Sequence, residues 1–421
     1  MMMTDLTAFC RELKLGAEEQ ALLTPVWEKL IEDWDGALPF FLDQAYFDRL
    51  YPYCAGNYQL SELRPYTEAV IEIARKNPAA ALLAHITHRG AFVLETPVAL
   101  DFLPDPLPIF GEKYSGVFSL MISLGAYPLM VQAYARAGVP EKYAQDALAW
   151  MGGTMKMYSL SHPGVPGRPF RFMWIRHYVK PELFRLGRLE FLMQKYSDQL
   201  PLIYRGPGGR LAALCREDWG FRADGRRAWP GETPDFVTPF VQSGETVTGV
   251  PCRPDGTVGD WRSPVTLDTR EWKPVASAWD LCPSIHIPGG ARMPFDEVKQ
   301  SLLTAREFFA RYFHKRVPLF SCVSWILNPA WESMLEHSNM VRFRQECFAF
   351  PAPHWGHNPG MAFVFGRSDV EPSELPATNP VQRAFQTAWR EGKLSAGGLF
   401  VLTDDLEKLG ARYYREAGLS L

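Results

Sequence analysis

With 421 residues and a hydrophobic content of 47%, the chain is long enough for two domains that each bury a sizeable core. A formal net charge of −3 excludes the strong positive field that binds nucleic acid or anionic membranes. The apolar runs are shorter than the ~20 residues of a membrane span, and residues 1–13 lack the apolar core of a signal peptide. We therefore expect a cytoplasmic protein with no nucleic-acid or membrane partner.

The first part of the chain, residues 1–160, has the periodicity of helices. Apolar residues recur every three or four positions, as in Leu63, Tyr66, Val70 and Ile73. Asn77 followed by Pro78 is typical of a helix start, and prolines 104, 106 and 108 indicate a loop. The pattern predicts an all-helical domain, which we interpret as scaffold or substrate cover.

Two histidines of this part, His85 and His88, lie three residues apart, with Glu95 about two turns further on. That spacing is compatible with a metal site, but no third ligand is close. A packed or solvent-facing pair is the simpler interpretation. The seven cysteines are scattered and form no CxxC pair, so they indicate neither a disulfide framework nor a zinc site. We expect no bound metal.

Residues 159–170 are rich in proline and glycine and are the segment most typical of a linker. Beyond it, residues 202–204 and 210–214 flank a glycine-rich turn and predict a hairpin, and further short strands are expected up to residue 267. We place the domain boundary at residue 160/161. Antiparallel strands followed by a strand, a helix and a strand predict an α+β fold for residues 161–421.

That strand, helix and strand occupy residues 282–326. Residues 285–287 predict a short buried strand that ends at Pro288, and apolar positions from 295 to 312 predict a helix of about five turns at ~3.6 residues per turn. Residues 319–325 predict the next strand. A helical crossover joins parallel strands, and the glycine turn before the helix offers backbone N–H groups to an anion.

Five phrases, in this order, resemble one family: Phe184-Arg-Leu-Gly-Arg-Leu-Glu-Phe, Thr246-Val-Thr-Gly-Val-Pro, His286-Ile-Pro-Gly-Gly, Cys322-Val-Ser-Trp and Ser338-Asn-Met-Val-Arg-Phe. The family is a bacterial two-domain group described as acyltransferases. Its members have a helical N-acyltransferase-type N-terminal domain and a GNAT-like C-terminal domain. The phrases fall within residues 160–421, and residues 1–160 match by helical character and position. The resemblance implies an α+β GNAT-like domain after an all-helical one.

The resemblance also implies a donor site for acyl-CoA or acetyl-CoA. In GNAT-type enzymes a central strand and the loop after it hold the pantetheine and diphosphate of the donor. By order of elements, these are residues 281–287 and 288–293 here, with 319–325 as the strand that splays away. Gly289, Gly290 and Arg292 would hold the diphosphate. We include Ser324 among the donor-binding residues. The usual Arg/Gln-x-x-Gly-x-Gly/Ala pattern is missing.

His286 is the candidate general base for acyl transfer to an amine, because a histidine with its ordinary pKa near ~6.5 accepts protons at neutral pH. The alternative is a histidine held by hydrogen bonds within a sheet. Glu190, on an early strand, faces either the same cleft or solvent. Val323 stands where similar sequences often carry a histidine, so a catalytic histidine at that position would be missing here.

Other polar residues suggest weaker hypotheses. Cys322 and Ser324 share a strand face, and a hydrolase would use one of them as nucleophile, but no activating base is evident. His354 and His357 lie in a loop between prolines and would gate or contact a site. Tyr413 and Tyr414 are candidate acids for the leaving thiolate.

The sequence thus predicts an N-acyltransferase that moves an acyl group from acyl-CoA to an amine, carried by a small molecule or a peptide. The alternative is a non-catalytic ligand- or partner-binding protein with a degenerate GNAT-like fold, favoured by the missing diphosphate pattern and by Val323. The acceptor, the acyl chain length and the oligomeric state do not follow from the sequence.

Overall fold

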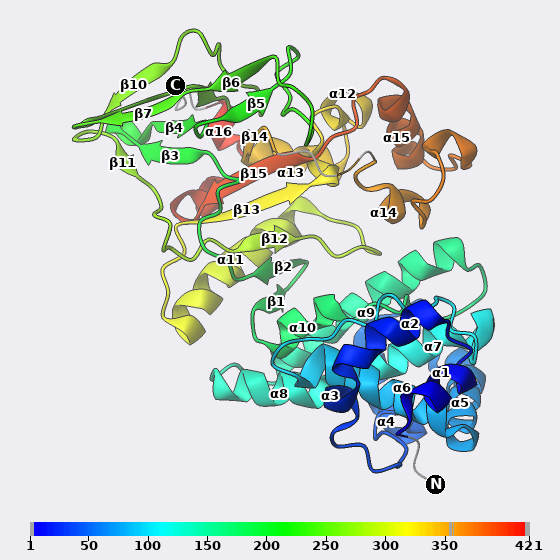
Figure 1. Ribbon diagram of the computed structural model, residues 1–421. Helices are drawn as coiled ribbons and strands as arrows, with labels where there is room; N and C mark the ends of the chain where they lie inside the picture. Colours follow the sequence, from blue (N-terminus) through cyan, green and yellow to red (C-terminus); the bar gives the residue numbers. More distant parts are fainter. Residues whose placement is uncertain (1–3, 353–355, 357, 417–421) are drawn as a thin grey trace. The chain divides into compact units, whose positions relative to one another are not determined.

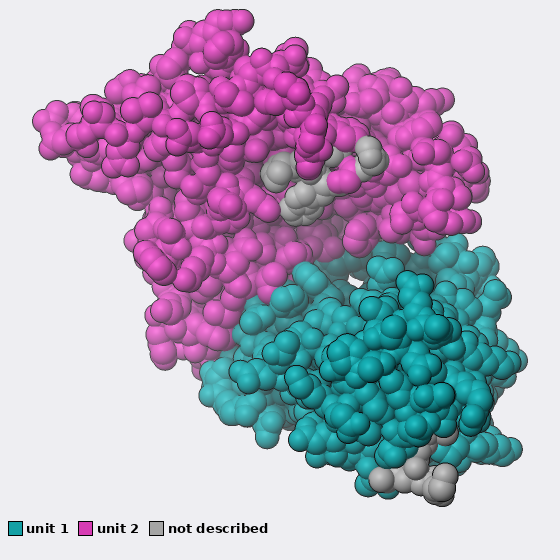
Figure 2. Space-filling model, viewed as in Figure 1, with its two compact units in different colours: residues 1–185, 288–291 teal, residues 186–287, 292–421 magenta. Residues whose placement is uncertain are grey.

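The computed structural model describes residues 4–352, 356 and 358–416 (Figure 1). The chain divides into two compact units (Figure 2). Unit 1 comprises the chain up to Arg185 together with residues 288–291, and unit 2 comprises residues 186–287 and the chain from Arg292 onward. The chain passes from unit 1 to unit 2 within one strand, β1, Leu183–Leu186.

Apart from the first residues of β1, the regular structure of unit 1 is helical, as the sequence predicted (Figure 1). Its α-helices are α1 Leu6–Glu12, α2 Ala17–Leu23, α3 Trp27–Ile31, α4 Gln44–Leu50, α5 Leu60–Lys76, α6 Pro78–His88, α7 Gly111–Leu124, α8 Tyr127–Arg136, α9 Lys142–Ser161 and α10 Met173–Val179. The side chain of Asn77 accepts hydrogen bonds from the backbone N–H groups of Ala79 and Ala80, at 2.9 and 3.3 Å, so α6 starts where the Asn-Pro pair indicated.

Helix α7 contains a long buried stretch, in which every residue from Ser115 to Leu124 is buried. Its three serines satisfy their hydroxyl groups within the helix: Ser115, Ser119 and Ser123 each donate to the carbonyl four residues earlier, at 2.7, 3.0 and 2.7 Å. The stretch 111–136 is long and apolar enough to cross a membrane by length and composition, and 78% of its most apolar part is buried inside the protein. Buried core helices of soluble proteins can have the same length and composition.

The segment expected to be a linker is an integral part of unit 1. Helix α9 continues through Ser161, and the backbone N–H of Arg168 donates to the carbonyl of Gly116 on α7, at 3.0 Å. The guanidinium of Arg168 is buried and donates to the hydroxyl of Ser123. Exposed backbone is therefore confined to the first part of the segment, around Gly164. The boundary at 160/161 stays a prediction.

Unit 2 is built on a six-stranded sheet with the order β1-β2-β12-β13-β15-β14 (Figure 1). Its strands are β1, β2 Leu189–Leu192, β12 Ser284–His286, β13 Leu319–Ser324, β15 Gly397–Leu402 and β14 Phe348–Phe350. Strands β12 and β13 are parallel, and helix α11, Phe295–Phe313, connects them, so the predicted crossover is confirmed. Mixed strand directions with helices give the α+β class that the sequence predicted.

Residues 202–274 add smaller antiparallel sheets to unit 2. Strands β3 Leu202–Arg205 and β4 Leu211–Leu214 pair across the glycine-rich turn, which confirms the predicted hairpin. The other strands are β5 Trp219–Phe221, β6 Phe236–Thr238, β7 Phe240–Ser243, β8 Thr246–Gly249, β9 Pro251–Cys252, β10 Val265–Asp268 and β11 Lys273–Pro274. The sheet orders are β11-β3-β4-β9, β10-β8-β7 and β5-β6.

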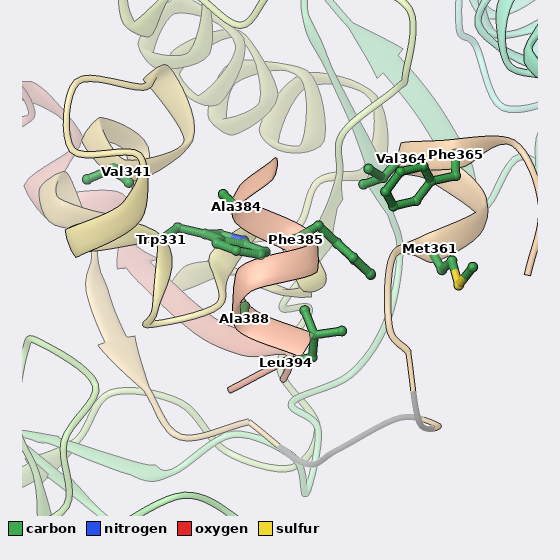
Figure 3. Packing of buried hydrophobic residues seen from close by; sticks show 9 residues of the cluster. All are labelled: Trp331, Val341, Met361, Val364, Phe365, Ala384, Phe385, Ala388 and Leu394. Carbon is green, nitrogen blue, oxygen red and sulfur yellow. The ribbon is translucent and has the colours of Figure 1, made fainter. Parts of the chain in front are cut away.

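A hydrophobic cluster surrounds helix α15, Pro380–Arg390, in unit 2 (Figure 3). The other helices of this part are α12 Trp331–Met334, α13 Asn339–Glu346, α14 Met361–Phe365 and α16 Tyr413–Glu416. Local pattern alone predicts a turn at the adjacent Gly397 and Gly398, and this prediction is wrong, because both glycines lie inside β15. A Cβ on Gly398 would lie 2.3 Å from the ring of Phe350, so glycine leaves room for a neighbouring side chain.

Candidate active site

The two parallel strands of unit 2 separate soon after they meet. Ser284 pairs with Ser321, and this is the single registered pair between β12 and β13 in the part of the chain that the structure describes. The backbone N–H of Ser321 also donates to the carbonyl of Pro283, at 3.2 Å. On its other side, β13 pairs with β15 along all six of its residues. The residues that follow Ser284 and Ser321 therefore border a gap in the sheet, which we call the splay.

His286 lies on the edge of the splay, directly opposite Glu190 on the neighbouring strand β2. Residues in register on antiparallel strands point to the same face, with Cβ atoms ~4.5–5.5 Å apart. Glu190 is 1% exposed, so it does not face solvent. His286 is half-buried, and its Nε2 lies 3.0 Å from the hydroxyl oxygen of Ser284. The structure thus brings the two residues predicted to be catalytic together.

The same face of the sheet carries a row of five positions, one on each of five neighbouring strands: Glu190, His286, Val323, Gly398 and Phe350. His286 and Val323 each lie two residues beyond the Ser284 to Ser321 pair, so they face the same side across the splay. Val323 pairs with Gly398, and Gly398 pairs with Phe350. Val323 therefore lies in the row of His286 and Glu190. A valine contributes packing there but no proton transfer.

Ser324 and Cys322 lie on the opposite face of β13 from this row, because they alternate with Ser321 and Val323. The hydroxyl of Ser324 accepts a weak hydrogen bond from the backbone N–H of Ile326, at 3.4 Å, as a helix cap. Cys322 is 2% exposed, and burial raises the pKa of its thiol to about 12. Burial therefore keeps Cys322 as a neutral thiol, and Ser324 does not share a face with His286.

The glycines predicted to hold a diphosphate lie in the segment 288–291, which is part of unit 1. Gly290 has φ +80°, a left-handed conformation that favours glycine, and its carbonyl accepts a hydrogen bond from Nζ of Lys156 on α9, at 3.0 Å. The backbone of Gly289 passes over Gly153 of α9 so closely that a Cβ at 153 would lie 2.9 Å from the Gly289 carbonyl. Packing on α9 thus explains Gly290 without an anion, and diphosphate binding stays a prediction.

Helix α11 starts at Phe295 after Pro294, and no side chain caps it. Its first backbone N–H groups are therefore open to a ligand, as the sequence suggested. Asp296 and Glu297 in the first turn already place negative charge there, which weakens the attraction for a diphosphate. Arg292, just before the helix, is exposed, and its carbonyl accepts a hydrogen bond from Nε of Arg188, at 2.7 Å.

Arg188 is a candidate positioning residue that sequence reasoning missed. Its side chain is 7% exposed, and its backbone N–H donates to the hydroxyl of Ser301 on α11, at 2.9 Å. Gly187 lets this turn approach α11, because a Cβ at 187 would lie 2.8 Å from that hydroxyl oxygen. The sequence feature that could have indicated Arg188 is its place after Gly187 in the phrase Phe184-Arg-Leu-Gly-Arg-Leu-Glu-Phe, which carries the family resemblance. We infer that Arg188 holds the start of α11 in place.

The other candidate histidines that the structure describes, His85 and His88, are packed among aromatic side chains of unit 1. His88 lies in the helical core of unit 1, where its Nε2 is 2.9 Å from the carbonyl of Gly125, and its ring stacks on Phe41. His85 packs against Trp34, with ring centroids 5.2 Å apart. The described residues contain no group of three histidine, cysteine, aspartate or glutamate side chains that would hold a metal ion. His354 and His357 lie outside the described residues.

Tyr414 is buried, and its hydroxyl accepts a hydrogen bond from the backbone N–H of Leu402, at 2.9 Å. Leu402 pairs with Leu319, the first residue of β13, so this hydroxyl lies at the end of the sheet away from the splay. Burial, and next the nearby Asp405, raise the pKa of Tyr414 well above its ordinary value. A role of Tyr414 as acid for a thiolate at the splay is therefore wrong.

The fold and the splay define a GNAT-like domain that follows a helical region in the sequence. The family described as "GNAT-like C-terminal domain" matches residues 183–399, and the chain belongs to this family. The search of curated proteins gave no match.

Solved structures similar in fold are of acyltransferases. A structure of an acyltransferase in complex with decanoyl-CoA and teicoplanin is 18% identical, has a TM-score of 0.58, and covers 95% of this chain and 99% of its own. A mutant acyltransferase with octanoyl-CoA is also 18% identical, with a TM-score of 0.57 and coverage of 94% and 99%. A complex with CoA and 10C-teicoplanin is 17% identical, with a TM-score of 0.58 and coverage of 95% and 99%.

Proposed function

We propose that the chain is an acyltransferase that takes an acyl group from acyl-CoA and transfers it to an amine. The observation that carries this proposal is the splay, where β12 and β13 separate after one pair beside the row of Glu190 and His286. The solved structures of similar fold contain decanoyl-CoA, octanoyl-CoA or CoA, which supports an acyl-CoA donor here.

The reaction needs little from the protein beyond placement and proton transfer. The amine nitrogen attacks the thioester carbonyl, the new carbon–nitrogen bond forms, and the carbon–sulfur bond breaks to release the thiolate of CoA. His286 accepts the proton that the amine loses. Glu190, in register with His286, favours the protonated imidazole that results, because opposite charges attract strongly in a buried setting. Backbone N–H groups that border the splay would polarise the carbonyl.

The acceptor is the finer part of the proposal. Two of the similar structures contain teicoplanin or 10C-teicoplanin, and teicoplanin is a glycopeptide. We propose an amine carried by a small molecule or a peptide as acceptor of this chain. A teicoplanin-type amine belongs in the first acceptor panel, beside simple amino acids and aliphatic amines.

Calorimetry tests the donor directly. Titration of decanoyl-CoA, octanoyl-CoA and free CoA into the full chain should give saturable binding, tighter for an acyl-CoA than for CoA when the acyl chain is accommodated. Mass spectrometry of the purified protein would detect a CoA species that copurifies. Absence of binding by all three compounds would contradict the proposal.

A second candidate function is a ligand-binding protein without catalysis. Two observations favour it: Val323 in the row offers no proton transfer, and Asp296 and Glu297 place negative charge at the start of α11. With this second function, the chain would bind acyl-CoA or another ligand without turnover. Release of free thiol from decanoyl-CoA in the presence of the acceptor panel distinguishes the two functions, because only the enzyme produces it.

A further inference from the structure

Two adjoining cavities lie in unit 2, apart from the row of Glu190 and His286. The smaller cavity, about 40 Å³, is lined by three arginines, Arg222, Arg226 and Arg227, among other residues. The larger cavity, about 240 Å³, is lined by Trp389 and Glu371, among others. Trp229 and Leu394 line both cavities, so the two volumes share a wall. The described lining of the smaller cavity contains no carboxylate.

A tight hairpin fixes the three arginines. The backbone N–H of Arg222 donates to the carbonyl of Arg226, at 2.8 Å, and Arg227 pairs with Phe221 of β5. Gly225 closes the turn in a left-handed conformation, φ +80°. The backbone therefore holds three cationic residues together at one site, and Glu232 and Asp224 compensate only part of their charge.

Arg227 is an arginine of this cavity with buried, unsatisfied hydrogen-bond donors. Its guanidinium lies over Trp219, 4.2 Å from the ring centroid, and near Phe221, at 5.6 Å. Its Nε and Nη1 are buried and have no hydrogen-bond partner in the described protein. Burial lowers the pKa of Arg227 to about 10, so it remains a cation at neutral pH. A cation whose buried donors lack acceptors is costly, so a negative charge placed close to this guanidinium would stabilise it.

The other two arginines are only loosely paired with carboxylates. Nε of Arg222 lies 3.6 Å from an oxygen of Glu232, and Nε of Arg226 lies 3.6 Å from an oxygen of Asp224. Arg226 also donates through Nη1 to the carbonyl of Gly392, at 2.8 Å, which orients its guanidinium. Both side chains are partly exposed, so the positive charge of the site reaches solvent.

Apolar walls adjoin the charged end. Leu394 belongs to the hydrophobic cluster around α15, where it lies beside Ala388 (Figure 3). Trp389 packs against the same cluster and faces the larger cavity, and Trp229 lies between the two cavities. A ligand that fits both cavities therefore has an anionic group next to an aromatic or aliphatic body.

The cavities lie at the same edge of the main sheet as the splay. Ser395 and Ala396, which line the smaller cavity, directly precede Gly397, and Gly397 pairs with Ser324 at the end of β13. Pro351 and Ala352, also in the lining, directly follow Phe350 of β14. This is the carboxyl edge of the parallel pair β12 and β13, where ligands of such sheets commonly bind.

We propose that this arginine-lined cavity binds the carboxylate of the acceptor, and that the acceptor is an amine that also carries a carboxylate beside an apolar or aromatic body. This class includes amino acids with large side chains and peptides that end in one. The proposal rests on the proposed function, because it assigns the acceptor of that reaction. The small volume of the charged end fits a carboxylate more closely than a diphosphate.

The test uses the full chain and needs no CoA. Calorimetry compares 3-phenylpropanoate with 3-phenylpropanamide, which has the same shape without the charge, and with inorganic phosphate. We expect the carboxylate to bind and the amide to bind at least about tenfold more weakly, since a charge-assisted hydrogen bond is lost. Equal binding of the amide, no binding of the carboxylate, or binding of phosphate alone would overturn the proposal.

Two variants localise the binding. Arg227→Gln and Arg226→Gln should each weaken 3-phenylpropanoate about 10- to 100-fold. Arg262→Gln is the matched control, because Arg262 lies in the same unit, is 72% exposed and does not line the cavities. If Arg227→Gln fails to fold, as judged by circular dichroism, Arg226→Gln decides alone. Equal losses in the control would overturn the site.

Acceptor use completes the test. With decanoyl-CoA as donor, L-phenylalanine should be acylated faster than L-phenylalaninamide, and Arg226→Gln should remove this preference. A preference for the amide would overturn the assignment of the acceptor. A protein that binds 3-phenylpropanoate through Arg226 but does not bind decanoyl-CoA would overturn the proposed function and leave the carboxylate site standing.

Discussion

Two histidines show how differently the two units use the same side chain. His88 in unit 1 stacks on Phe41, with ring centroids 4.9 Å apart, and bonds to a backbone carbonyl. Burial lowers its pKa to about 4, so it is neutral throughout the physiological range. His286 in unit 2 lies at the splay, beside the hydroxyl of Ser284 and opposite the carboxylate of Glu190.

The difference is one of surroundings. Burial among aromatic rings disfavours the imidazolium of His88, whereas His286 is half-buried, beside the hydroxyl of Ser284 and opposite Glu190. A histidine that gains and loses a proton during turnover needs the second environment, and a histidine that holds a helical core together needs the first. Variants of the two residues should therefore separate rate from stability.

The largest effect is expected from His286→Gln. Loss of a general base commonly lowers the rate by ~10²- to 10⁴-fold, and the amide of glutamine keeps much of the volume and polarity of the ring. We expect decanoyl-CoA turnover with a working amine to fall by this factor, while the melting temperature changes little. Unchanged turnover in a normally folded variant would remove His286 from the mechanism and make Glu190 the next residue to test.

His88→Gln should have the opposite profile, with turnover per folded molecule preserved and stability changed with pH. A histidine with an ordinary pKa of 6.5 in the unfolded chain and about 4 in the folded protein binds its proton more readily when unfolded. The native protein therefore loses stability as pH falls from about 6.5 to 4, by up to about 3 kcal/mol.

Denaturant unfolding between pH 7 and pH 4 measures this effect. The variant lacks the titrating ring, so the stability difference between the native protein and His88→Gln should shrink as the solution is acidified. A difference that stays constant across this range would contradict the neutral, packed state of His88.

The sequence predicted much of the fold because local patterns carry it. The stripe of Leu63 and Val70 is buried in α5, and the Asn-Pro pair starts α6. The strand, helix and strand of residues 284–324 follow from their periods and from the glycine turn. Errors arose where tertiary contacts decide: Gly397 and Gly398 lie within a strand because Leu327 and Phe350 occupy the space that side chains would need.

The candidate site was predicted in part, for a related reason. The sequence placed His286 and Glu190 on strands, but their register, which puts them opposite each other, depends on long-range pairing. The face of Ser324 depends on the pair of Ser284 and Ser321, which local pattern does not reveal. The sequence pattern did not indicate a site at the arginines of the turn 222–227, because the cavity forms only when residues distant in the chain enclose them.

The adjacent glycines Gly289 and Gly290 separate a role in packing from a role in donor binding. Gly290 has a positive φ, and a Cβ there would lie 2.9 Å from Cδ of Lys156, so Gly290→Ala should lower stability by about 1 kcal/mol or more. A Cβ at Gly289 would meet nothing within 4 Å, so Gly289→Ala should leave stability unchanged. Thermal unfolding of both variants tests the packing of the segment.

Binding then tests the diphosphate hypothesis without confusion from folding. If backbone N–H groups of the segment hold the donor, Gly289→Ala obstructs the approach of the diphosphate and weakens decanoyl-CoA binding while the melting temperature stays the same. Normal affinity of Gly289→Ala would indicate that the segment has only the structural role seen in its packing on α9.

The smallest effect concerns Lys156, which the sequence did not single out. Its ammonium donates to the carbonyl of Gly290, at 3.0 Å, in an exposed position. Exposed polar contacts of this kind contribute ~0.5–1 kcal/mol, so Lys156→Met should lower the melting temperature by a few degrees at most. Lys76→Met is the control, since Lys76 forms an exposed pair with Glu72 within α5. A structural contact alone predicts that both variants bind decanoyl-CoA as the native protein does. A lower affinity in Lys156→Met only, with a weaker dependence on salt, would show that this ammonium also interacts with the phosphates of the donor.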